Sequence, residues 1–475
     1  MIIGVGYHAR RIYLPFLMRN HDYTVLMCGV DIKSQKNVIE DYLKDRHYEL
    51  PIYYTDDLNQ DSINEGLDSL LSRLVGKYDI DSVIISTEPL MHYKYAKWAL
   101  NNNLNILMDK PITAEREVST NINKSNKIKK DFDELANLYR CKKKEGLVQA
   151  FSLMSQRRFH PAYTFMKEAV EEVFDRTRCP LTSVQISHSD GQWRFPTEII
   201  EQNYHPYNQG YGKLSHSGYH SLDIINWLVS ATSVDEKRID NIDVFSSFVR
   251  PVDFLSQFCL DDYKNIFSGF DQFNKYNKEE FCNLAKDYGE IDAFSTIAFK
   301  QGDRVLCLGS VNLIHNGFSQ RSWLSVQGRD LYKGNGRIRQ ESYFIEQGPF
   351  QSIAFLSYQS KELDPSNNHR SYDFGDEWHL DIHLFRNSKM FPDWQAHQVY
   401  SIKDLSNEYM TGYSRGHQED ARIACVIDFC ESVKNKKDTK SDLLSHKNGT
   451  YLLSAMYESE IRKMNNQNPL VNVKI

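Results

Sequence analysis

Short apolar segments alternate with predicted helices over the first third of the chain. β-branched residues dominate the segment Ser82–Ser86, and similar apolar segments recur on either side of it. Strands that alternate with helices indicate βαβ units in a parallel, doubly wound sheet whose strands are buried on both faces. We therefore predict an α/β Rossmann domain over residues 1–145. Its strands are expected at Met1–Val5, Tyr23–Asp31, Pro51–Tyr54, Ser82–Ser86 and Asn105–Met108, and helices at Ala9–Arg19 and Tyr93–Asn101.

The pattern changes after about residue 146. Segments rich in β-branched and aromatic residues now follow one another, separated by turn residues, which favours a large, mostly antiparallel, open sheet. Residues 146–475 are thus predicted to form an α+β domain for substrate binding and oligomerisation. Its C-terminal helices, within 417–462, are expected to pack back toward the N-terminal domain. Predicted strands are Leu147–Leu153, Thr182–Ser189, Asn241–Val249, Ile291–Lys300, Arg304–His315 and Gln351–Tyr358; helices are Pro161–Val173, Ala421–Val433 and Lys447–Arg462.

Composition narrows the class of protein. A length of 475 residues suits two or three domains, and a formal net charge of -6 argues against nucleic-acid or anionic-membrane partners. The sequence lacks an apolar run long enough to cross a bilayer and shows no signal-peptide pattern. Its eight cysteines form no CxxC pair or metal-ligand spacing. We therefore expect a cytoplasmic protein with reduced thiols and no metal site.

A glycine motif follows the first predicted strand. Residues 4–9, with Gly4, Gly6 and Ala9, fit the pattern G-x-G-x-x-G/A between a strand and a helix. Gly4 permits the tight turn, Gly6 leaves room for a pyrophosphate, and Ala9 lets the helix pack closely on the strand. Because the helix N-terminus adds amide donors, we predict a dinucleotide cofactor here, with Tyr7 and His8 beside it.

An acidic residue, Asp31, closes the second predicted strand. It lies at about the separation expected for the acid that binds the adenosine ribose hydroxyls. A carboxylate at that position repels a 2′-phosphate, so the sequence predicts NAD rather than NADP. The alternative interpretation is that Asp31 only caps a turn.

Three further segments carry a family resemblance. They are Thr87–His92 with Asn105–Pro111, Gln156–Pro161, and Gly210–Asp223. In this order, behind a dinucleotide motif, they resemble the Gfo/Idh/MocA family (glucose-fructose oxidoreductase, inositol dehydrogenase and relatives). Asp109-Lys110-Pro111 looks like that family's Glu-Lys-Pro signature, and residues 216–223 look like its D-x-x-x-H with a trailing acid. The chain from His417 through Ser454–Ser459 looks like the family's closing helices.

The resemblance implies an NAD-dependent oxidoreductase that acts on the CH–OH group of a sugar, cyclitol, sugar acid or nucleotide sugar. It also implies a homo-oligomer, a dimer or tetramer formed through the outer face of the large sheet. Cofactor contacts are implied at five further positions. These are Thr87, Pro89, His92, Asp109 and Lys110.

Hydride transfer from an alcohol requires residue types that are present in these motifs. Removal of a hydride from a carbinol carbon requires the hydroxyl proton to leave, and His220 is the candidate base. Lys110 follows the fifth predicted strand, at the edge where open α/β sheets bind ligands, and its ammonium would stabilise the alkoxide. Asp223, one helical turn after His220, is a candidate for orienting the site. The alternatives are a surface lysine and a structural histidine.

Two departures from the family pattern stand out. His216 occupies the position of the aspartate, where an imidazole could bind a hydroxyl, share a proton relay, or mark altered or lost activity. Asp109 replaces glutamate and keeps the charge on a shorter arm. The chain is also longer than usual for the family. We place the insertions near Glu115–Lys130, Asp253–Glu290 and Gly328–Gln398, and expect the second to be a packed subdomain.

The substrate itself is not defined by these patterns. Aromatic and basic side chains in the second domain are candidates for stacking on a sugar ring or holding an anionic group, with packing or surface charge as the alternative for each. They are Arg157, Arg158, Trp193, Arg194, Tyr204 and His205. Two other functions stay open: an NAD-dependent glycoside hydrolase that oxidises its sugar transiently, and a non-catalytic sensor of NAD and sugar.

Overall fold

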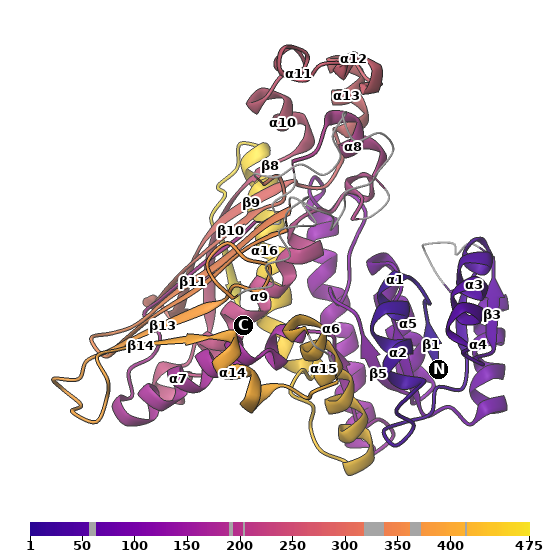
Figure 1. The fold of residues 1–475 in the computed structure, drawn as a ribbon, viewed down its shortest axis with the longest axis horizontal. Coiled ribbons are helices and arrows are strands. Elements are labelled where there is room, and N and C mark those ends of the chain that lie inside the picture. Colours follow the sequence, from indigo (N-terminus) through magenta and orange to yellow (C-terminus); the bar gives the residue numbers. More distant parts are fainter. Residues whose placement is uncertain (57–62, 190–192, 203–204, 318–336, 362–371, 414–415) are drawn as a thin grey trace. The chain divides into compact units, whose positions relative to one another are not determined.

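The chain forms two compact units that are interleaved in sequence (Figure 1). The computed structural model describes residues 1–56, 63–189, 193–202, 205–317, 337–361, 372–413 and 416–475. Unit 1 comprises residues 1–114, 128–161 and 409–450, and unit 2 comprises residues 115–127, 162–408 and 451–475. The predicted boundary between residues 145 and 146 falls inside unit 1.

Unit 1 contains a parallel sheet of six strands in the order β3-β2-β1-β4-β5-β6. The strands are β1 (Ile2–Ile3), β2 (Gly29–Ile32), β3 (Ile52–Thr55), β4 (Ser82–Ile85), β5 (Asn105–Met108) and β6 (Phe151–Leu153). The doubly wound sheet predicted from the sequence is confirmed. The predicted strand Tyr23–Asp31 was too long, since only its end pairs with β1 and β3.

The helices of unit 1 correct one further prediction. A single helix over Ala9–Arg19 is wrong, because α1 (Tyr7–Arg11) and α2 (Tyr13–Leu17) meet at Ile12, whose φ is -113°. Pro15 explains the break: it has no N–H to donate, and its ring clashes with the carbonyl four residues earlier, at Arg11. The other helices are α3 (Lys36–Arg46), α4 (Glu65–Tyr78), α5 (Pro89–Asn101), α6 (Ile122–Lys144) and α15 (His417–Asn435).

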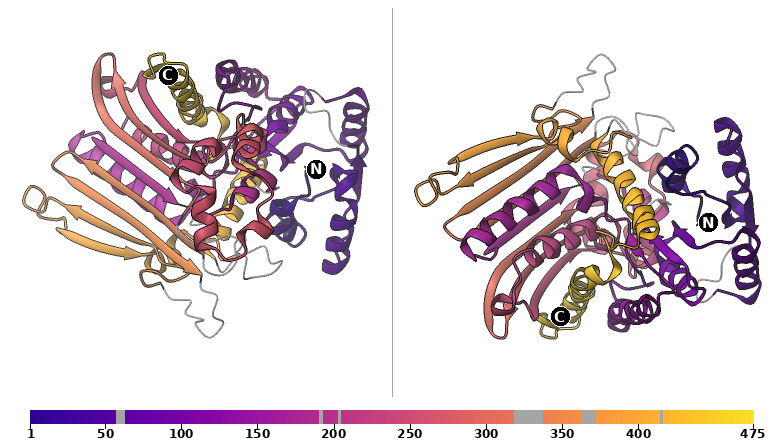
Figure 2. Two further views of the ribbon diagram at one scale, coloured as in Figure 1. Left: turned by 90° about the horizontal axis from the view of Figure 1, so that it is seen from above. Right: turned by 90° about the horizontal axis from the view of Figure 1, so that it is seen from below.

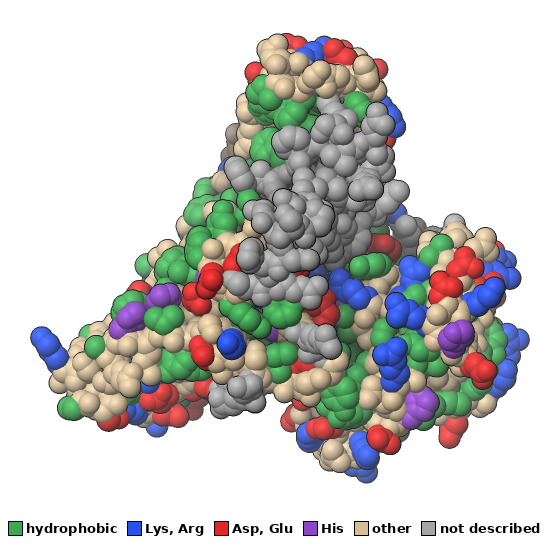
Figure 3. Space-filling view, in the orientation of Figure 1, with side chains coloured by type: hydrophobic (Ala, Val, Ile, Leu, Met, Phe, Trp, Pro, Cys, Tyr) green, Lys and Arg blue, Asp and Glu red, His purple; other side chains and the backbone are tan. Residues whose placement is uncertain are grey.

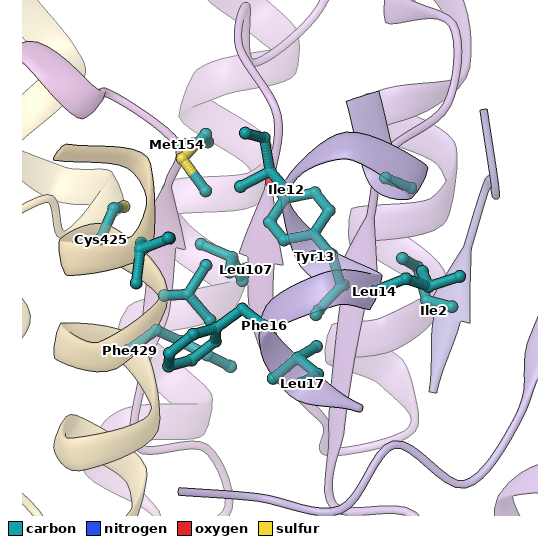
Figure 4. Close-up of a cluster of buried hydrophobic side chains, with 14 of the residues drawn as sticks. Ile2, Ile12, Tyr13, Leu14, Phe16, Leu17, Leu107, Met154, Cys425 and Phe429 are labelled. Atoms are coloured by element: carbon teal, nitrogen blue, oxygen red, sulfur yellow. The ribbon is translucent and has the colours of Figure 1, made fainter. Parts of the chain in front are cut away.

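The hydrophobic core of unit 1 joins residues from both ends of the chain. Figure 4 shows Phe16 and Leu107 beside Cys425 and Phe429 of α15, together with Met154. All five side chains are buried. A helix that lies some 400 residues after the glycine motif therefore completes the core beneath that motif.

Unit 2 is built on a sheet of nine strands in the order β14-β13-β12-β11-β7-β10-β9-β8-β15. Only β7 and β10 pair in parallel, so the predicted mostly antiparallel sheet is confirmed. The strands are β7 (Ser183–Ser189), β8 (Asn241–Val249), β9 (Asp292–Gln301), β10 (Arg304–Ile314), β11 (Arg337–Gln347), β12 (Gln351–Lys361), β13 (Asp381–Arg386), β14 (His397–Ser401) and β15 (Val471–Lys474).

Helices cover one face of this sheet, as Figure 2 shows. Tyr163 of α7 (Pro161–Thr177) stacks on Phe355 of β12, with ring centroids 5.3 Å apart. Tyr457 of α16 (Lys447–Met464) packs edge-on against Phe248 of β8. The third covering helix is α9 (Tyr219–Ser230), whose Ile225 approaches Gly309 of β10.

The opposite face of the sheet is open within unit 2. Side chains alternate along each strand, so every second residue points away from the covering helices. Leu308, Phe344 and Phe294 on this face are 58, 45 and 44 % exposed, and Figure 3 shows hydrophobic side chains gathered along the sheet. The homo-oligomer expected through this face stays a prediction.

The insertion at Asp253–Glu290 forms a packed helical subdomain, as expected. Its helices are α10 (Pro251–Gln257), α11 (Leu260–Ile266), α12 (Phe270–Phe273) and α13 (Lys278–Ala285), which pack with α8 (Pro196–Glu201) beyond the ends of β8 and β9 (Figure 1). Phe254, Tyr263 and Phe281 are fully buried between them. Residues 328–336 and 362–371 of the third predicted insertion lie outside the described residues. The described part contains β11 to β13 and the start of β14, and α14 (Ile402–Tyr409) follows.

Candidate cofactor and catalytic site

The glycine motif forms a turn that only glycine can make at its first position. Gly4 has φ +89°, and a Cβ there would lie 2.3 Å from the carbonyl oxygen of Ser86. Gly6 begins α1, and a Cβ at this position would meet nothing within 4 Å. Ala9 is fully buried behind it. The turn thus has the closed inner side and the open outer side that dinucleotide binding requires.

Alanine substitutions at Gly4 and Gly6 should have different effects, the first on stability and the second on cofactor affinity. Gly4→Ala places a side chain in a left-handed conformation against the Ser86 backbone, which costs about 3 kcal/mol of stability and lowers Tm. Gly6→Ala leaves Tm unchanged but fills the space needed by a pyrophosphate, so NADH affinity falls about tenfold or more. Thermal unfolding and NADH fluorescence titration measure the two effects. Equal behaviour of the two variants would contradict this division.

Asp31 holds the glycine turn from the end of β2. Its Oδ2 accepts a hydrogen bond from the Val5 N–H at 2.5 Å, and its Oδ1 accepts one from the Ile32 N–H at 2.7 Å. Burial raises the pKa of this carboxyl although both N–H groups favour its ionised form. Asp31 therefore caps the turn, and its contact with a ribose stays a prediction.

The carboxylate of Asp109 anchors the turn that carries Lys110. Tyr13 donates its hydroxyl to Oδ1 at 2.5 Å, and Ser86 donates to Oδ2 at 2.6 Å. Nε2 of His8 lies 3.6 Å from Oδ1. Asp109 thus ties the end of β5 to α2 and to the end of β4, and Lys110 follows directly at the carboxyl edge of the sheet.

The imidazole of His8 is neutral at physiological pH. Burial lowers its pKa to about 4, outweighing the opposite effect of the Asp109 carboxylate. Its ring meets the ring of Tyr13 edge-on, with centroids 5.3 Å apart. The neighbouring Tyr7 is 56 % exposed and lies at the start of α1.

The buried imidazole of His92 contacts two loops of unit 1. Its ring is fully buried, with Nδ1 2.6 Å from the Pro111 carbonyl oxygen and Nε2 3.1 Å from that of Thr87. Burial lowers its pKa. The imidazole therefore links the loop after β4, where α5 begins at Pro89, to the Lys110 turn. It holds these two loops together, and its contact with a cofactor stays a prediction.

In unit 2 the predicted catalytic residues share one helical stretch. His216 lies in a π-helical turn, Leu214–Gly218, which continues directly into α9 with His220 and Asp223. The three side chains are 4, 8 and 1 % exposed. Spacings of four and three residues bring such side chains to one side of a helix. Lys110 belongs to unit 1, so the structure describes the two halves of the predicted site separately.

The ring of His216 stacks on a second imidazole. His205 lies parallel to it, with centroids 4.4 Å apart and planes 12° apart, and Tyr211 packs on it at 5.0 Å. His205 was predicted only as a residue of the pocket rim. No spacing in the sequence links it to His216, because residues 205 and 216 lie on separate elements.

Two of the three arginines considered as anion ligands, Arg158 and Arg194, are buried and donate hydrogen bonds within the fold. Arg158 is 1 % exposed and donates to the Ser445 hydroxyl at 2.6 Å. Arg194 is equally buried and donates to Gln202 and to the carbonyl of His315, both at 2.9 Å. Trp193 donates to the Tyr263 hydroxyl within the inserted subdomain, Arg157 is buried, and Tyr204 lies outside the described residues.

A pocket of about 470 Å³ in unit 2 is not part of this constellation. It is lined by Ser189, Trp193, Ile314, Asn316, Gly317 and Gln340. Leu313 of β10 points toward Gly218 beside α9, so the adjacent Ile314 points to the open face. The pocket therefore lies across the sheet from His216 and His220. Among the described residues no group of three or more His, Cys, Asp or Glu could hold a metal ion, and none of their helices has the length and apolar character to span a membrane.

Comparisons with known proteins bear on both units. Residues 1–141 match the family model of the Gfo/Idh/MocA oxidoreductases, described as an oxidoreductase family with an NAD-binding Rossmann fold. No curated protein matches the chain.

Solved structures share the fold over the whole chain. Levoglucosan dehydrogenase in complex with NADH and levoglucosan is 12 % identical, with a TM-score of 0.58 and coverage of 100 % of this chain and 98 % of that one. An oxidoreductase domain protein from Kribbella flavida is 13 % identical, with a TM-score of 0.59 and the same coverage. Aldose-aldose oxidoreductase from Caulobacter crescentus is 12 % identical, with a TM-score of 0.54 and again the same coverage.

At such low identity these structures show the fold alone, whereas the family model identifies a sequence family. Strands β1 to β5 of the parallel sheet, the glycine turn and the Lys110 turn all lie within the 141 residues that it matches. Over residues 1–141 this chain is thus similar to the Gfo/Idh/MocA family of NAD-binding oxidoreductases.

Proposed function

We propose that the protein is an NAD-dependent dehydrogenase that moves a hydride between the nicotinamide and a hydroxyl-bearing carbon of a sugar, cyclitol or nucleotide sugar. The observation that carries this proposal is the turn after β5, where the partly buried hydrogen bonds of Asp109 hold Lys110 at the carboxyl edge of the sheet. Printed names of structures with the same fold include dehydrogenases of sugars and of a UDP-sugar, which supports this substrate class.

The residues of unit 1 fit a dinucleotide. Gly6 leaves open space where a pyrophosphate would approach, and the amides at the start of α1 would face it. Asp31 would bind the adenosine ribose with the edge of its carboxylate, while Thr87 and Lys110 stand at the edge where the nicotinamide would lie. When bound, NAD supplies the carbon that accepts or returns the hydride.

The reaction also needs a proton to move. In oxidation, the imidazole of His220 would take the proton of the substrate hydroxyl while the C–H bond breaks and its hydrogen leaves with both electrons as hydride, which goes to the nicotinamide. The C–O bond would become a carbonyl. The ammonium of Lys110 stabilises the negative charge that grows on this oxygen. His216, stacked on His205, offers an imidazole to a neighbouring hydroxyl where the family has a carboxylate.

Cofactor choice should depend on Asp31. Asp31→Asn removes the charge that repels a 2′-phosphate but keeps an oxygen for the Val5 N–H. The ratio of NADPH to NADH affinity should therefore rise about tenfold. Fluorescence titration with both reduced cofactors measures the ratio. An unchanged ratio would assign Asp31 to the turn alone.

The proposed function is tested with the purified chain, NAD⁺ and a panel of free sugars, cyclitols, sugar acids and nucleotide sugars. A steady rise in NADH absorbance at 340 nm with one group of substrates supports the proposal. Release of an aglycone without net NADH would instead indicate the transient-oxidation hydrolase. Silence across the panel with NADH bound would overturn the dehydrogenase assignment, and His216→Asp would then test whether that residue accounts for lost activity.

A further inference from the structure

A buried glutamate stands beside the turn that carries His216. Glu290 is the last residue of the inserted subdomain before β9, and it is 0 % exposed. Its Oε1 accepts from the Leu214 N–H at 2.8 Å and from the Tyr457 hydroxyl at 3.1 Å, and its Oε2 accepts from the Ser119 hydroxyl at 2.6 Å. Its main-chain carbonyl accepts from the Lys213 N–H at 3.0 Å. The three partners of the carboxylate all donate, which is the pattern that an ionised carboxylate requires.

The partners of Glu290 belong to the two stretches of chain that carry the predicted catalytic groups. Leu214 is the first residue of the π-helical turn with His216, and α9 with His220 follows without a break. Ser119 lies nine residues after Lys110, and its own N–H donates to the carbonyl of Gly210 at 3.1 Å. One carboxylate thus bonds both to the turn before His220 and to the segment that continues from Lys110.

Close backbone packing and a second hydroxyl reinforce this junction. A Cβ on Gly212 would lie 1.9 Å from the carbonyl oxygen of Glu290, so only glycine allows the two backbones to approach. Tyr457 of α16, besides bonding to Glu290, lies 2.9 Å from the hydroxyl of Ser215 in the turn. Burial raises the pKa of Glu290, and the bonds from Ser119, Leu214 and Tyr457 act in the opposite direction. The three hydrogen-bond donors therefore offset part of the cost of burying the Glu290 carboxylate.

We propose that Glu290 is a positioning residue for the reaction: its carboxylate fixes the Leu214–Gly218 turn, and with it His216 and His220, to the segment that follows the Lys110 turn. This inference rests on the proposed function for its catalytic consequence, but the structural consequence can be measured without a substrate. The control is Glu341, another buried glutamate of unit 2, which accepts from the hydroxyls of Tyr163 and Tyr343 and pairs with Arg339.

The substrate-independent test is amide hydrogen exchange in the full chain, followed by mass spectrometry on peptides covering residues 212–220. Glu290→Ala should raise exchange of these peptides at least tenfold, because the Leu214 N–H loses its acceptor. Tyr457→Phe removes one donor and should give a smaller rise, while Glu341→Ala should leave the peptides unchanged. Unchanged exchange in Glu290→Ala, or an equal rise in Glu341→Ala, overturns the proposal. If Glu290→Ala does not fold, Tyr457→Phe against Glu341→Gln decides it by the same criterion.

The catalytic test uses the substrate found with the panel above. A misplaced base costs rate rather than cofactor affinity, so Glu290→Ala should lower kcat about 10- to 100-fold with KM for NAD⁺ unchanged. Glu290→Gln keeps an oxygen for Leu214 and an amide for Ser119, whose hydroxyl can reverse, and should restore kcat to within about threefold. Full kcat in folded Glu290→Ala overturns the inference. Absence of turnover in the unmutated chain is a failure of the proposed function, which the exchange result distinguishes.

Discussion

Lys110→Ala is expected to lower kcat by about 10²- to 10³-fold, the loss typical when one group that stabilises a developing oxyanion is removed. The ammonium would act where charge grows on the substrate oxygen, so its removal raises the barrier and leaves the ground state nearly unchanged. NADH affinity should stay within about threefold, because the glycine turn and Asp31 do not depend on this side chain. Steady-state rates at saturating NAD⁺ and NADH titration measure the two quantities.

Lys97 provides the matched control for this prediction. It lies on α5 in the same unit, pairs with Glu134 and is 43 % exposed, so Lys97→Ala should change neither rate nor binding. Lys110→Arg keeps the positive charge in a planar, larger group and should restore only part of the rate. Full turnover by Lys110→Ala would refute the catalytic role assigned to Lys110 and remove the main support for the proposed function.

His220→Asn is expected to lower kcat by about 10²- to 10⁴-fold, the range over which a positioned general base contributes. Asparagine is close in size and can donate a hydrogen bond, but it cannot accept the hydroxyl proton in the operating pH range. In the unmutated chain the rate of oxidation should fall as the pH drops and the imidazole becomes protonated. The variant should lose this acid limb, so a pH–rate profile tests proton transfer apart from packing.

His397→Asn serves as the control for the histidine. This residue lies on β14 at the edge of the open face, far along the sheet order from β7 and β10. It should retain both the rate and the shape of the profile. A His220→Asn variant that keeps the acid limb at reduced rate would assign the base to another group, with His216 the first to examine.

Much of the fold was predictable because its signals are local. Continuous apolar strands buried on both faces gave the parallel sheet, and enrichment in β-branched and aromatic residues gave β8 to its last residue. The predicted helix Ala9–Arg19 is interrupted because of Pro15. This break could have been predicted, since proline disrupts the preceding helical turn in any sequence. The division into units was not predictable, because Phe429 and Phe16 meet in one core from opposite ends of the chain.

The candidate site shows the same contrast. Short motifs singled out Gly4, Asp31, Lys110 and His220 as candidates: Gly4 and Lys110 follow strands, Asp31 lies near the end of β2, and His220 lies near the start of α9. The groups that hold these residues gave no signal: Tyr13 reaches Asp109 across 96 positions, and Tyr457 reaches Glu290 across 167. Hydroxyls and buried acids of this kind obey no periodicity, so only the folded chain reveals them.

The interleaving of the two units has a consequence for synthesis. The polypeptide passes from one unit to the other five times, and unit 1 receives its last segment only at residues 409–450. While the ribosome is still making unit 2, the side of the parallel sheet near Phe16 and Leu107 lacks α15, the helix that will cover it. A nascent chain therefore carries an unfinished nucleotide-binding half through most of its translation, and neither half can be produced by cutting the gene at one point.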